Sequence, residues 1–169
     1  MSDIAEAVSR VVAHLEAHPE DGYDGGVSVT ATTTGLRASS ESPDGHVVVT
    51  DMPRGIGGGA SAPSPGWLLR AALASCDATL IAMRAAYVGV ELDTLEVTVA
   101  MDFDDRGLVG TDDTVHAGPL SSNVSVRIGS ENADEETLRG IVDWAEHHSP
   151  VGDALDRAIP GTLDVDIVD

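Results

Sequence analysis

The spacing of hydrophobic residues predicts a helix followed by two strands in the first third of this 169-residue chain. Residues 3–17 carry apolar side chains at the three- and four-residue intervals of an amphipathic helix. Segments 27–34 and 46–51 alternate and are rich in β-branched residues, which predicts strands. The sequence Ser42-Pro43-Asp44-Gly45 between them is typical of a turn.

A long apolar helix is predicted over residues 67–88, which contain no glycine or proline. Ser64 is a suitable N-cap and Pro65 a suitable first-turn residue. The only charges, Arg70, Asp77 and Arg84, recur every seven residues and form one thin stripe, so we expect the helix to be buried on most sides. The preceding segment, 52–66, is rich in Gly, Pro and Ser, which favours a shaped functional loop.

The second half of the chain predicts two strands, two helices and a last strand. Residues 95–104 alternate, and the alternation returns at 124–128 after a Gly- and Asp-rich hairpin loop. Helices are predicted over 135–148 and from Pro150 through Ala158, with a final strand over 163–167. The resulting order, α-ββ-α-ββ-αα-β, indicates an α+β fold with a mixed or antiparallel sheet around the long central helix.

Composition excludes several classes of function. Nine arginines and no lysine against 29 acidic residues give a net charge of −20, which repels nucleic acid and anionic membrane surfaces. No run reaches the 18 or so uninterrupted apolar residues of a membrane span, and the first ten residues do not resemble a signal peptide. A single cysteine forbids an internal disulfide, so we expect a cytoplasmic protein.

Cys76 is the main candidate for chemistry, and two interpretations of it remain open. Among apolar neighbours in the middle of a helix, it fits a small buried hydrophobe. As a reactive thiolate it would need a nearby cation. No arginine lies three or four positions from Cys76, so an activating cation must come from elsewhere, with Arg37 and Arg54 as the candidates.

Other motifs carry less weight. The run G-I-G-G-G at 55–59 lacks the lysine of a P-loop and the spacing of a dinucleotide fingerprint. Adjacent helical residues point about 100° apart, so His147 and His148 do not form a metal pair, and no metal or cofactor is predicted. No GxSxG elbow occurs. A different reaction, using either histidine beside Ser149, is a weaker possibility.

The run GGGASAPSPGWLLRAALASCDATL resembles the OsmC/Ohr family, in which a Gly-rich loop, a Pro-containing turn and an Ala/Leu-rich helix lead to a peroxidatic cysteine. Upstream, VTATTTGLR resembles the family's first strand and arginine-bearing turn, and HVVVTDMPRGIGG the strand that enters the loop. Downstream, AEHHSPVGDAL resembles the family's Cys-Pro-Val segment. The resemblance makes residues 25–169 one OsmC-like domain and residues 1–24 an N-terminal helical extension.

The resemblance implies an intertwined α+β homodimer that reduces organic hydroperoxides at two interfacial sites. Cys76 falls on the attacking thiol and Arg37 on the arginine that stabilises it. Two positions depart from the family. Ser149 stands where the family has its resolving cysteine, and Gly66 stands where the peroxidases have the glutamate that orients the arginine.

Two functions therefore remain open from the sequence. The first is a one-cysteine peroxidase, whose Cys76 is recycled by an external thiol reductant because Ser149 cannot form a disulfide. The second is an OsmC-like protein that has lost its redox cycle and binds a small apolar ligand at the dimer interface. The reactivity of the Cys76 thiol distinguishes them.

Overall fold

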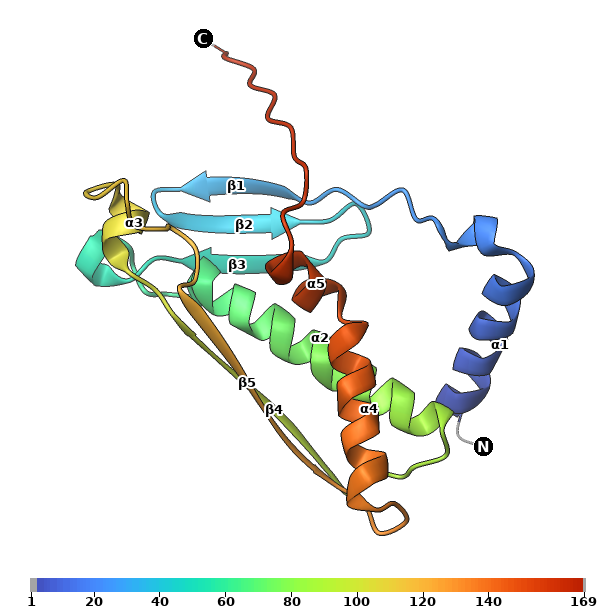
Figure 1. Cartoon of the computed structure of the whole chain (residues 1–169). Helices are drawn as coiled ribbons and strands as arrows, with labels where there is room; N and C mark the ends of the chain where they lie inside the picture. Colours follow the sequence, from blue (N-terminus) through green and yellow to red (C-terminus); the bar gives the residue numbers. More distant parts are fainter. Residues whose placement is uncertain (1–2, 169) are drawn as a thin grey trace.

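The structure is a computed structural model that describes residues 3–168, so residues 1–2 of the predicted extension and residue 169 lie outside the described part (Figure 1). Helices and strands follow the chain in this order: α1 (Asp3–Ala17), η1 (Pro19–Gly22), β1 (Thr30–Thr34), β2 (Arg37–Glu41), β3 (Val47–Asp51), η2 (Arg54–Ile56), α2 (Pro65–Tyr87), β4 (Thr94–Asp102), α3 (Asp105–Val109), β5 (Ser121–Gly129), α4 (Glu135–His147) and α5 (Pro150–Asp156). The α+β class is confirmed.

The strands form two antiparallel sheets. One has the order β1-β2-β3, and the other is the β4-β5 hairpin. Strand β2 was not predicted from the sequence, because its small and polar residues lack the apolar alternation of a strand. A tight turn makes β2 possible: Gly35 has φ of +61°, and Thr34 pairs with Arg37 across it.

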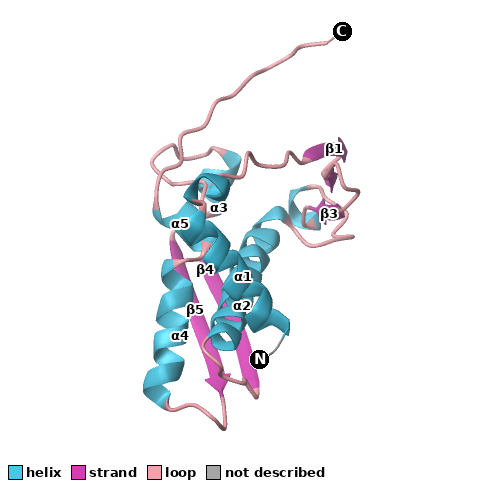
Figure 2. Cartoon of the chain, turned by 90° about the vertical axis from the view of Figure 1, so that its right-hand side faces the viewer, coloured by secondary structure: helices cyan, strands magenta, loops and turns pink. Residues whose placement is uncertain are grey.

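Helix α2 is the central element, as predicted, and packs against β4, α4, α1 and α5. Figure 2 shows α4 and the β4-β5 hairpin on one side of α2, with β1 and β3 set apart from both. Ser64 caps the helix by accepting the Trp67 amide at 3.2 Å, with Pro65 as its first residue. The principal core is made by five buried residues: Ile81, Ala85, Val90, Ile141 and Ala145.

The prediction that α2 is buried on most sides is wrong for the single chain. Only Leu73, Asp77, Ile81 and Ala85 are buried, and their four-residue spacing defines one narrow stripe. Asp77, expected on a polar stripe, therefore faces the interior, where its Oδ1 has no hydrogen-bond partner among the described residues. The remaining apolar surface of α2 is open to another element or another chain.

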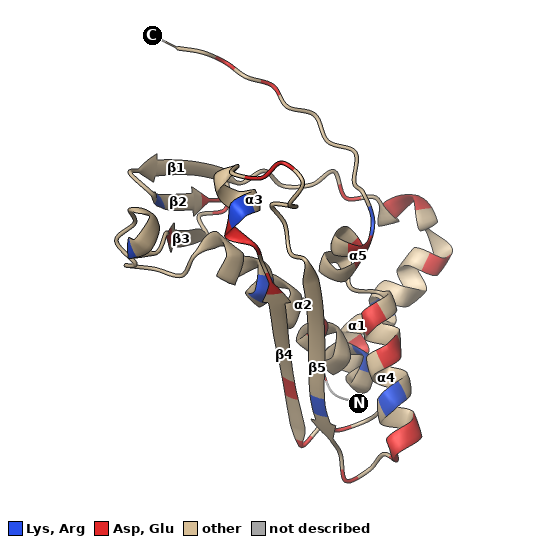
Figure 3. Cartoon of the chain, turned by 60° about the vertical axis from the view of Figure 1, so that its left-hand side comes forward, with Lys and Arg blue, Asp and Glu red and all other residues tan. Residues whose placement is uncertain are grey.

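By length and composition, α2 is the one described helix that could cross a membrane. Its contacts instead identify it as the core helix of this fold, because it packs on β4 and on α4. Acidic residues are spread over several helices and loops of the molecule (Figure 3).

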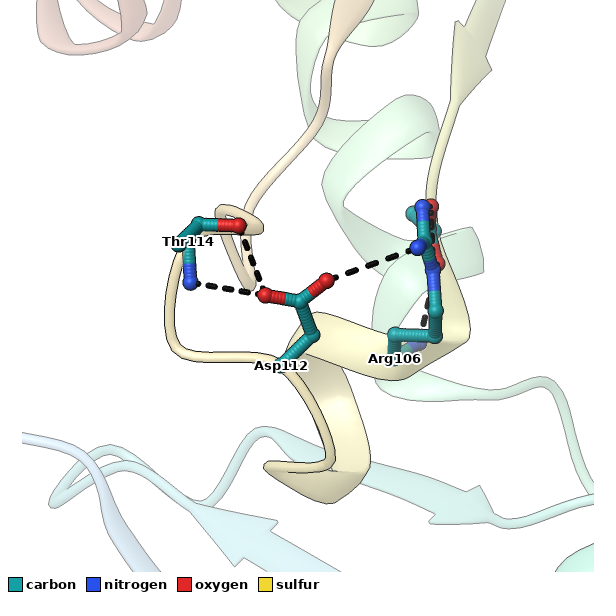
Figure 4. A network of polar contacts seen from close by, with 4 residues as sticks. Arg106, Asp112 and Thr114 are labelled. Atoms are coloured by element: carbon teal, nitrogen blue, oxygen red, sulfur yellow. Dashed lines mark hydrogen bonds and ion pairs between the residues drawn. The ribbon is translucent and has the colours of Figure 1, made fainter.

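The loop between β4 and β5 contains the short helix α3, which the sequence analysis did not predict. Asp104 caps α3 and receives the Arg106 side chain, whose shortest contact is 2.6 Å. The hydrogen bond from Arg106 lowers the pKa of Asp104 to about 2. Arg106 also reaches Asp112 at 3.4 Å, and Thr114 Oγ1 donates to Asp112 at 2.6 Å (Figure 4). Side-chain hydrogen bonds thus order a segment that has almost no hydrophobic pattern.

The predicted final strand is absent from this chain. Helix α5 ends at Asp156, and every residue of 157–168 is exposed and irregular (Figure 1). The alternating residues Leu163 and Ile167 are 88% and 89% exposed, although their spacing is that of a half-buried strand. The sheet partner that this alternation requires is not supplied by the described part of the same chain.

The β1-β2-β3 sheet is uncovered as well. All five residues of β1 are exposed, and so are Val47 and Val48 of β3. An apolar strand segment left open to water is typical of a surface that binds another chain.

Candidate functional site

Cys76 and Ser149 lie in direct contact, although 73 residues separate them in the sequence. The Ser149 hydroxyl donates a hydrogen bond to the Cys76 sulfur at 3.3 Å. Ser149 is 2% exposed, whereas Cys76 is half-buried. A half-buried sulfur is accessible to a small reactant, and the Ser149 hydroxyl gives it a hydrogen-bond donor.

The end of α4 and the start of α5 position the serine. Ser149 is the N-cap of α5, and its oxygen accepts the Gly152 amide at 3.1 Å while its hydrogen points to Cys76. Pro150 follows as the first helical residue. A Cβ at Gly152 would lie 3.1 Å from the Ser149 Cβ, so the glycine leaves the room that the serine needs.

Neither predicted arginine is a partner of Cys76 within the described chain. Arg37 is exposed at the start of β2, opposite Asp51 of β3, in the sheet that stands apart from α2. Arg54 is exposed in η2, within the Gly-rich loop. The described part of a single chain therefore brings Cys76 and Ser149 together but places neither Arg37 nor Arg54 beside the thiol.

Gly66 lies in the first turn of α2, next to an arginine that the sequence analysis did not select. Arg70 donates to the Gly66 carbonyl at 2.9 Å and to the Met101 carbonyl at 2.8 Å, and its guanidinium lies 4.7 Å from the Phe103 ring centre. A Cβ at Gly66 would be 3.8 Å from Arg70 Nη1. The sequence signal for this contact was the four-residue spacing of Gly66 and Arg70, which places both on the same face of a helix. Arg70 joins α2 to the end of β4.

The Gly-rich loop is shaped by a buried carboxylate. Asp51, at the end of β3, accepts the Ser61 amide at 2.9 Å, the Ser61 hydroxyl at 2.8 Å and the Gly59 amide at 3.2 Å. A side chain at Gly58 would overlap the Met52 carbonyl. These contacts fix the path of the chain from the three-stranded sheet into α2, as the prediction of a shaped loop requires.

We expect Asp51→Asn to lower the melting temperature by several degrees at neutral pH, because an amide would present its own N–H group to the donors of the loop. The hydrogen bonds from Ser61 lower the pKa of Asp51 in the folded protein. The ionised Asp51 carboxylate therefore contributes its full stabilisation at pH values above its pKa in the unfolded chain, which is about 3.9. This stabilisation is lost as the pH falls through its lower pKa in the folded protein.

Thermal unfolding at several pH values measures this effect, with the exposed Asp113→Asn as the matched control. The difference in melting temperature between wild type and Asp51→Asn should narrow below about pH 4, where the unfolded chain takes up a proton on Asp51 before the folded protein does. Equal melting temperatures at pH 7 would contradict the assigned role of Asp51.

The two histidines at the end of α4 are engaged locally. His147 Nδ1 lies 2.7 Å from the Asp143 carbonyl, and His148 Nδ1 lies 2.6 Å from that of Trp144. The His148 ring stacks on the Trp144 indole with centroids 4.2 Å apart. Neither ring hydrogen-bonds Ser149 in the part of the chain that the structure describes. These contacts do not support histidine chemistry at Ser149.

Comparison with known proteins places this arrangement in a family. The family model described as "OsmC-like protein" matches residues 57–164, a span that contains both Cys76 and Ser149 but begins after Arg37 and Arg54. No curated protein matches the chain.

Solved structures share the fold at low sequence identity. The OsmC-like protein of Mycoplasma pneumoniae is 18% identical, with a TM-score of 0.66 over 79% of this chain and 89% of that chain. The organic hydroperoxide resistance protein OsmC of Legionella pneumophila is 19% identical, with a TM-score of 0.57 over 77% and 88%. The organic hydroperoxide resistance protein OhrB of Bacillus subtilis is 21% identical, with a TM-score of 0.50 over 76% and 89%. Because the family model covers more than half of the sequence, this chain belongs to the OsmC-like protein family.

Proposed function

We propose that this protein reduces organic hydroperoxides through Cys76, and that an external thiol restores the cysteine after each turnover. The observation that carries the proposal is the contact between the half-buried Cys76 sulfur and the buried Ser149 hydroxyl in an OsmC-like chain. The names of the Legionella and Bacillus proteins, which refer to organic hydroperoxide resistance, support the choice of substrate class.

The first half of the reaction needs one sulfur and one hydroperoxide. The Cys76 thiolate attacks the terminal oxygen, the O–O bond breaks, and the alkoxide leaves and takes up a proton to become an alcohol. The products are the alcohol and a sulfenic acid on Cys76. The Ser149 hydroxyl, 3.3 Å from the sulfur, stabilises the thiolate before attack.

The second half requires a reductant, because Ser149 has no thiol. A dithiol attacks the sulfenic sulfur, releasing water and forming a mixed disulfide. The second thiol of the reductant then displaces Cys76 and leaves as a disulfide. One hydroperoxide and one dithiol thus give one alcohol, one water and one oxidised dithiol. Such reductants are maintained in a reducing compartment, so the proposal places the protein in the cytoplasm.

The active form in this proposal is a homodimer, with Arg37 supplied by the partner subunit. Three exposed features support an intertwined assembly: the uncovered strands β1 and β3, the unpaired segment 163–168 and the incompletely buried α2. An anionic thiolate in a chain of net charge −20 needs a cation, and none reaches Cys76 within one described chain. A second copy can place Arg37 there.

A brief pulse of one equivalent of organic hydroperoxide tests the proposal. We expect Cys76 to gain one oxygen, detected by mass spectrometry after trapping with a reagent specific for sulfenic acid. Excess hydroperoxide should carry the sulfur on to the sulfinic acid, and a small dithiol added early should restore turnover. Cys76→Ser is the matched control for oxidation at other residues. An unmodified Cys76 after the pulse would overturn the peroxidase proposal.

The alternative is a redox-inactive protein that binds a small apolar ligand at the dimer interface. The observation that favours it is the absence of a cation beside Cys76 within the described chain, together with Ser149 and Gly66 at the two altered positions. In that case Cys76 should remain reduced in the pulse experiment, while an apolar ligand should still protect it from alkylation.

A further inference from the structure

An apolar pocket lies between α1, α2 and α4, away from the Cys76–Ser149 contact. It has a volume of about 290 Å³, near the lower end of the range for small-ligand pockets, which begins at roughly 300 Å³. Val8, Val11 and Val12 of α1 form one wall, and α2 supplies the opposite wall. Cys76 does not line this pocket, and Met83, which does, lies about 10 Å farther along the α2 axis.

The single charged group in the pocket is Arg84. Its guanidinium lies 5.0 Å from the centre of the Trp144 ring and 5.6 Å from that of Tyr87, and both rings line the pocket. In contrast to the five arginines that form ion pairs or hydrogen bonds in the described chain, Arg84 has no such partner there.

Arg84 has no acidic partner among the described residues although acidic residues outnumber arginines 29 to nine, and unlike the exposed Arg10, Arg37 and Arg54 it lines a pocket. The residues three and four positions away on α2 are Leu80, Ile81, Tyr87 and Val88, none of which is acidic. Aromatic rings attract a guanidinium through their faces but accept none of its five N–H donors in the way that a carboxylate does. An uncompensated cation beside an apolar pocket is complementary to an anion with an apolar tail.

We infer that this pocket binds a single-chain carboxylate of medium length, with its alkyl tail between α1 and α2 and its carboxylate on Arg84. The apolar walls remove the tail from water, and the guanidinium fork matches the two carboxylate oxygens. The valines of α1 are not closed off by the chain itself: Val11 is 57% exposed although it belongs to the apolar face of that helix. The site is independent of peroxide reduction.

Binding of decanoate, below its critical micelle concentration, tests the inference with the full chain. Because Trp144 lines the pocket, its fluorescence should change in a saturable way, and calorimetry should give one site per chain. We expect decyltrimethylammonium, with the same tail and the opposite charge, to bind at least tenfold more weakly. Equal affinities for the two, or no saturable decanoate binding, would overturn the inference.

Two variants separate the charge from the cavity. Arg84→Gln should weaken decanoate binding at least tenfold, whereas Arg139→Gln, an exposed arginine of α4, should leave it unchanged. Val8→Phe, which fills the pocket, should abolish binding while far-UV circular dichroism stays that of the wild type. If Val8→Phe disturbs the fold, the pair Arg84→Gln and Arg139→Gln still decides the question. Unchanged affinity in Arg84→Gln would overturn the role of the guanidinium.

Failure of decanoate binding can be distinguished from failure of the proposed peroxidase function. Arg84→Gln should be oxidised at Cys76 by a hydroperoxide pulse at the same rate as the wild type, because Arg84 does not contact the Cys76–Ser149 pair. Decanoate binding without Cys76 oxidation would leave this inference standing and remove the peroxidase proposal. If instead decanoate binds only when a second copy is dissociated, the pocket is a subunit contact and the inference is wrong.

Discussion

Ser149→Cys is expected to convert the protein into a peroxidase that forms an internal disulfide. The Ser149 oxygen already lies 3.3 Å from the Cys76 sulfur, and a small rotation of either side chain brings two sulfurs to the bonding distance of about 2.05 Å. After one equivalent of hydroperoxide, the introduced thiol should attack the sulfenic acid on Cys76 and expel water. Nearly all of the protein should then contain the disulfide.

Protection from overoxidation should accompany this change. In wild type, excess hydroperoxide competes with the external reductant for the sulfenic acid; in Ser149→Cys, the neighbouring thiol reacts first, and the yield of sulfinic acid should fall by at least about tenfold. Intact-mass measurement before and after reduction distinguishes the two products. Ser149→Ala serves as the control, since it removes the hydroxyl without adding a thiol. Sulfinic acid at the wild-type level in Ser149→Cys would contradict the assigned geometry.

Helices and strands that are specified by residues close together in the sequence could be predicted. The central helix is the best case, because Ser64, Pro65 and an uninterrupted apolar run specify its start and its length within one segment. The partners of Cys76 were harder to foresee. Ser149 was identified only through the resemblance to a family, since no local pattern shows that the cap of a short C-terminal helix meets the middle of α2.

The errors of prediction have a common physical origin: each depends on contacts with another segment of this chain or with another chain. Asp77 was assigned to a polar stripe, but packing against β4 and α4 decides which side of α2 is buried. β2 was missed because hydrogen bonds to both neighbouring strands, not apolar alternation, hold it in the sheet. The predicted last strand, 163–167, has the right alternation but no strand partner among the described residues 3–168 of its own chain.

In the proposed homodimer, the separation of Arg37 and Cys76 within one subunit has the same origin. Arg37 sits on a sheet whose outer strand is fully exposed, while Cys76 sits on a helix whose surface is only partly covered. Two copies, each offering an unfilled surface, can complete one another. If Arg37 of one subunit serves Cys76 of the other, mixed dimers of two inactive variants should regain activity, which a site within one chain would not allow.

Arg37→Gln is expected to slow oxidation of Cys76 by about a hundredfold, the usual effect of removing one preorganised charged donor from a reaction that moves negative charge. Its stability should change little, because Arg37 is exposed at the start of β2. Stopped-flow measurement of thiol loss under excess hydroperoxide gives the rate, and Arg139→Gln, exposed on α4, is the matched control. An unchanged rate in Arg37→Gln would remove Arg37 from the site.

Mixed dimers then show which subunit supplies the arginine. A chain carrying Arg37→Gln retains Cys76, and a chain carrying Cys76→Ser retains Arg37, so each homodimer should be slow or inactive. When the two are co-expressed with different tags and the heterodimer is isolated, one of its two sites contains both groups if Arg37 acts across the interface. The heterodimer should then recover about half of the wild-type rate per dimer. If Arg37 acts within its own chain, neither site is complete and no rate is recovered, so the assignment across the interface would be wrong.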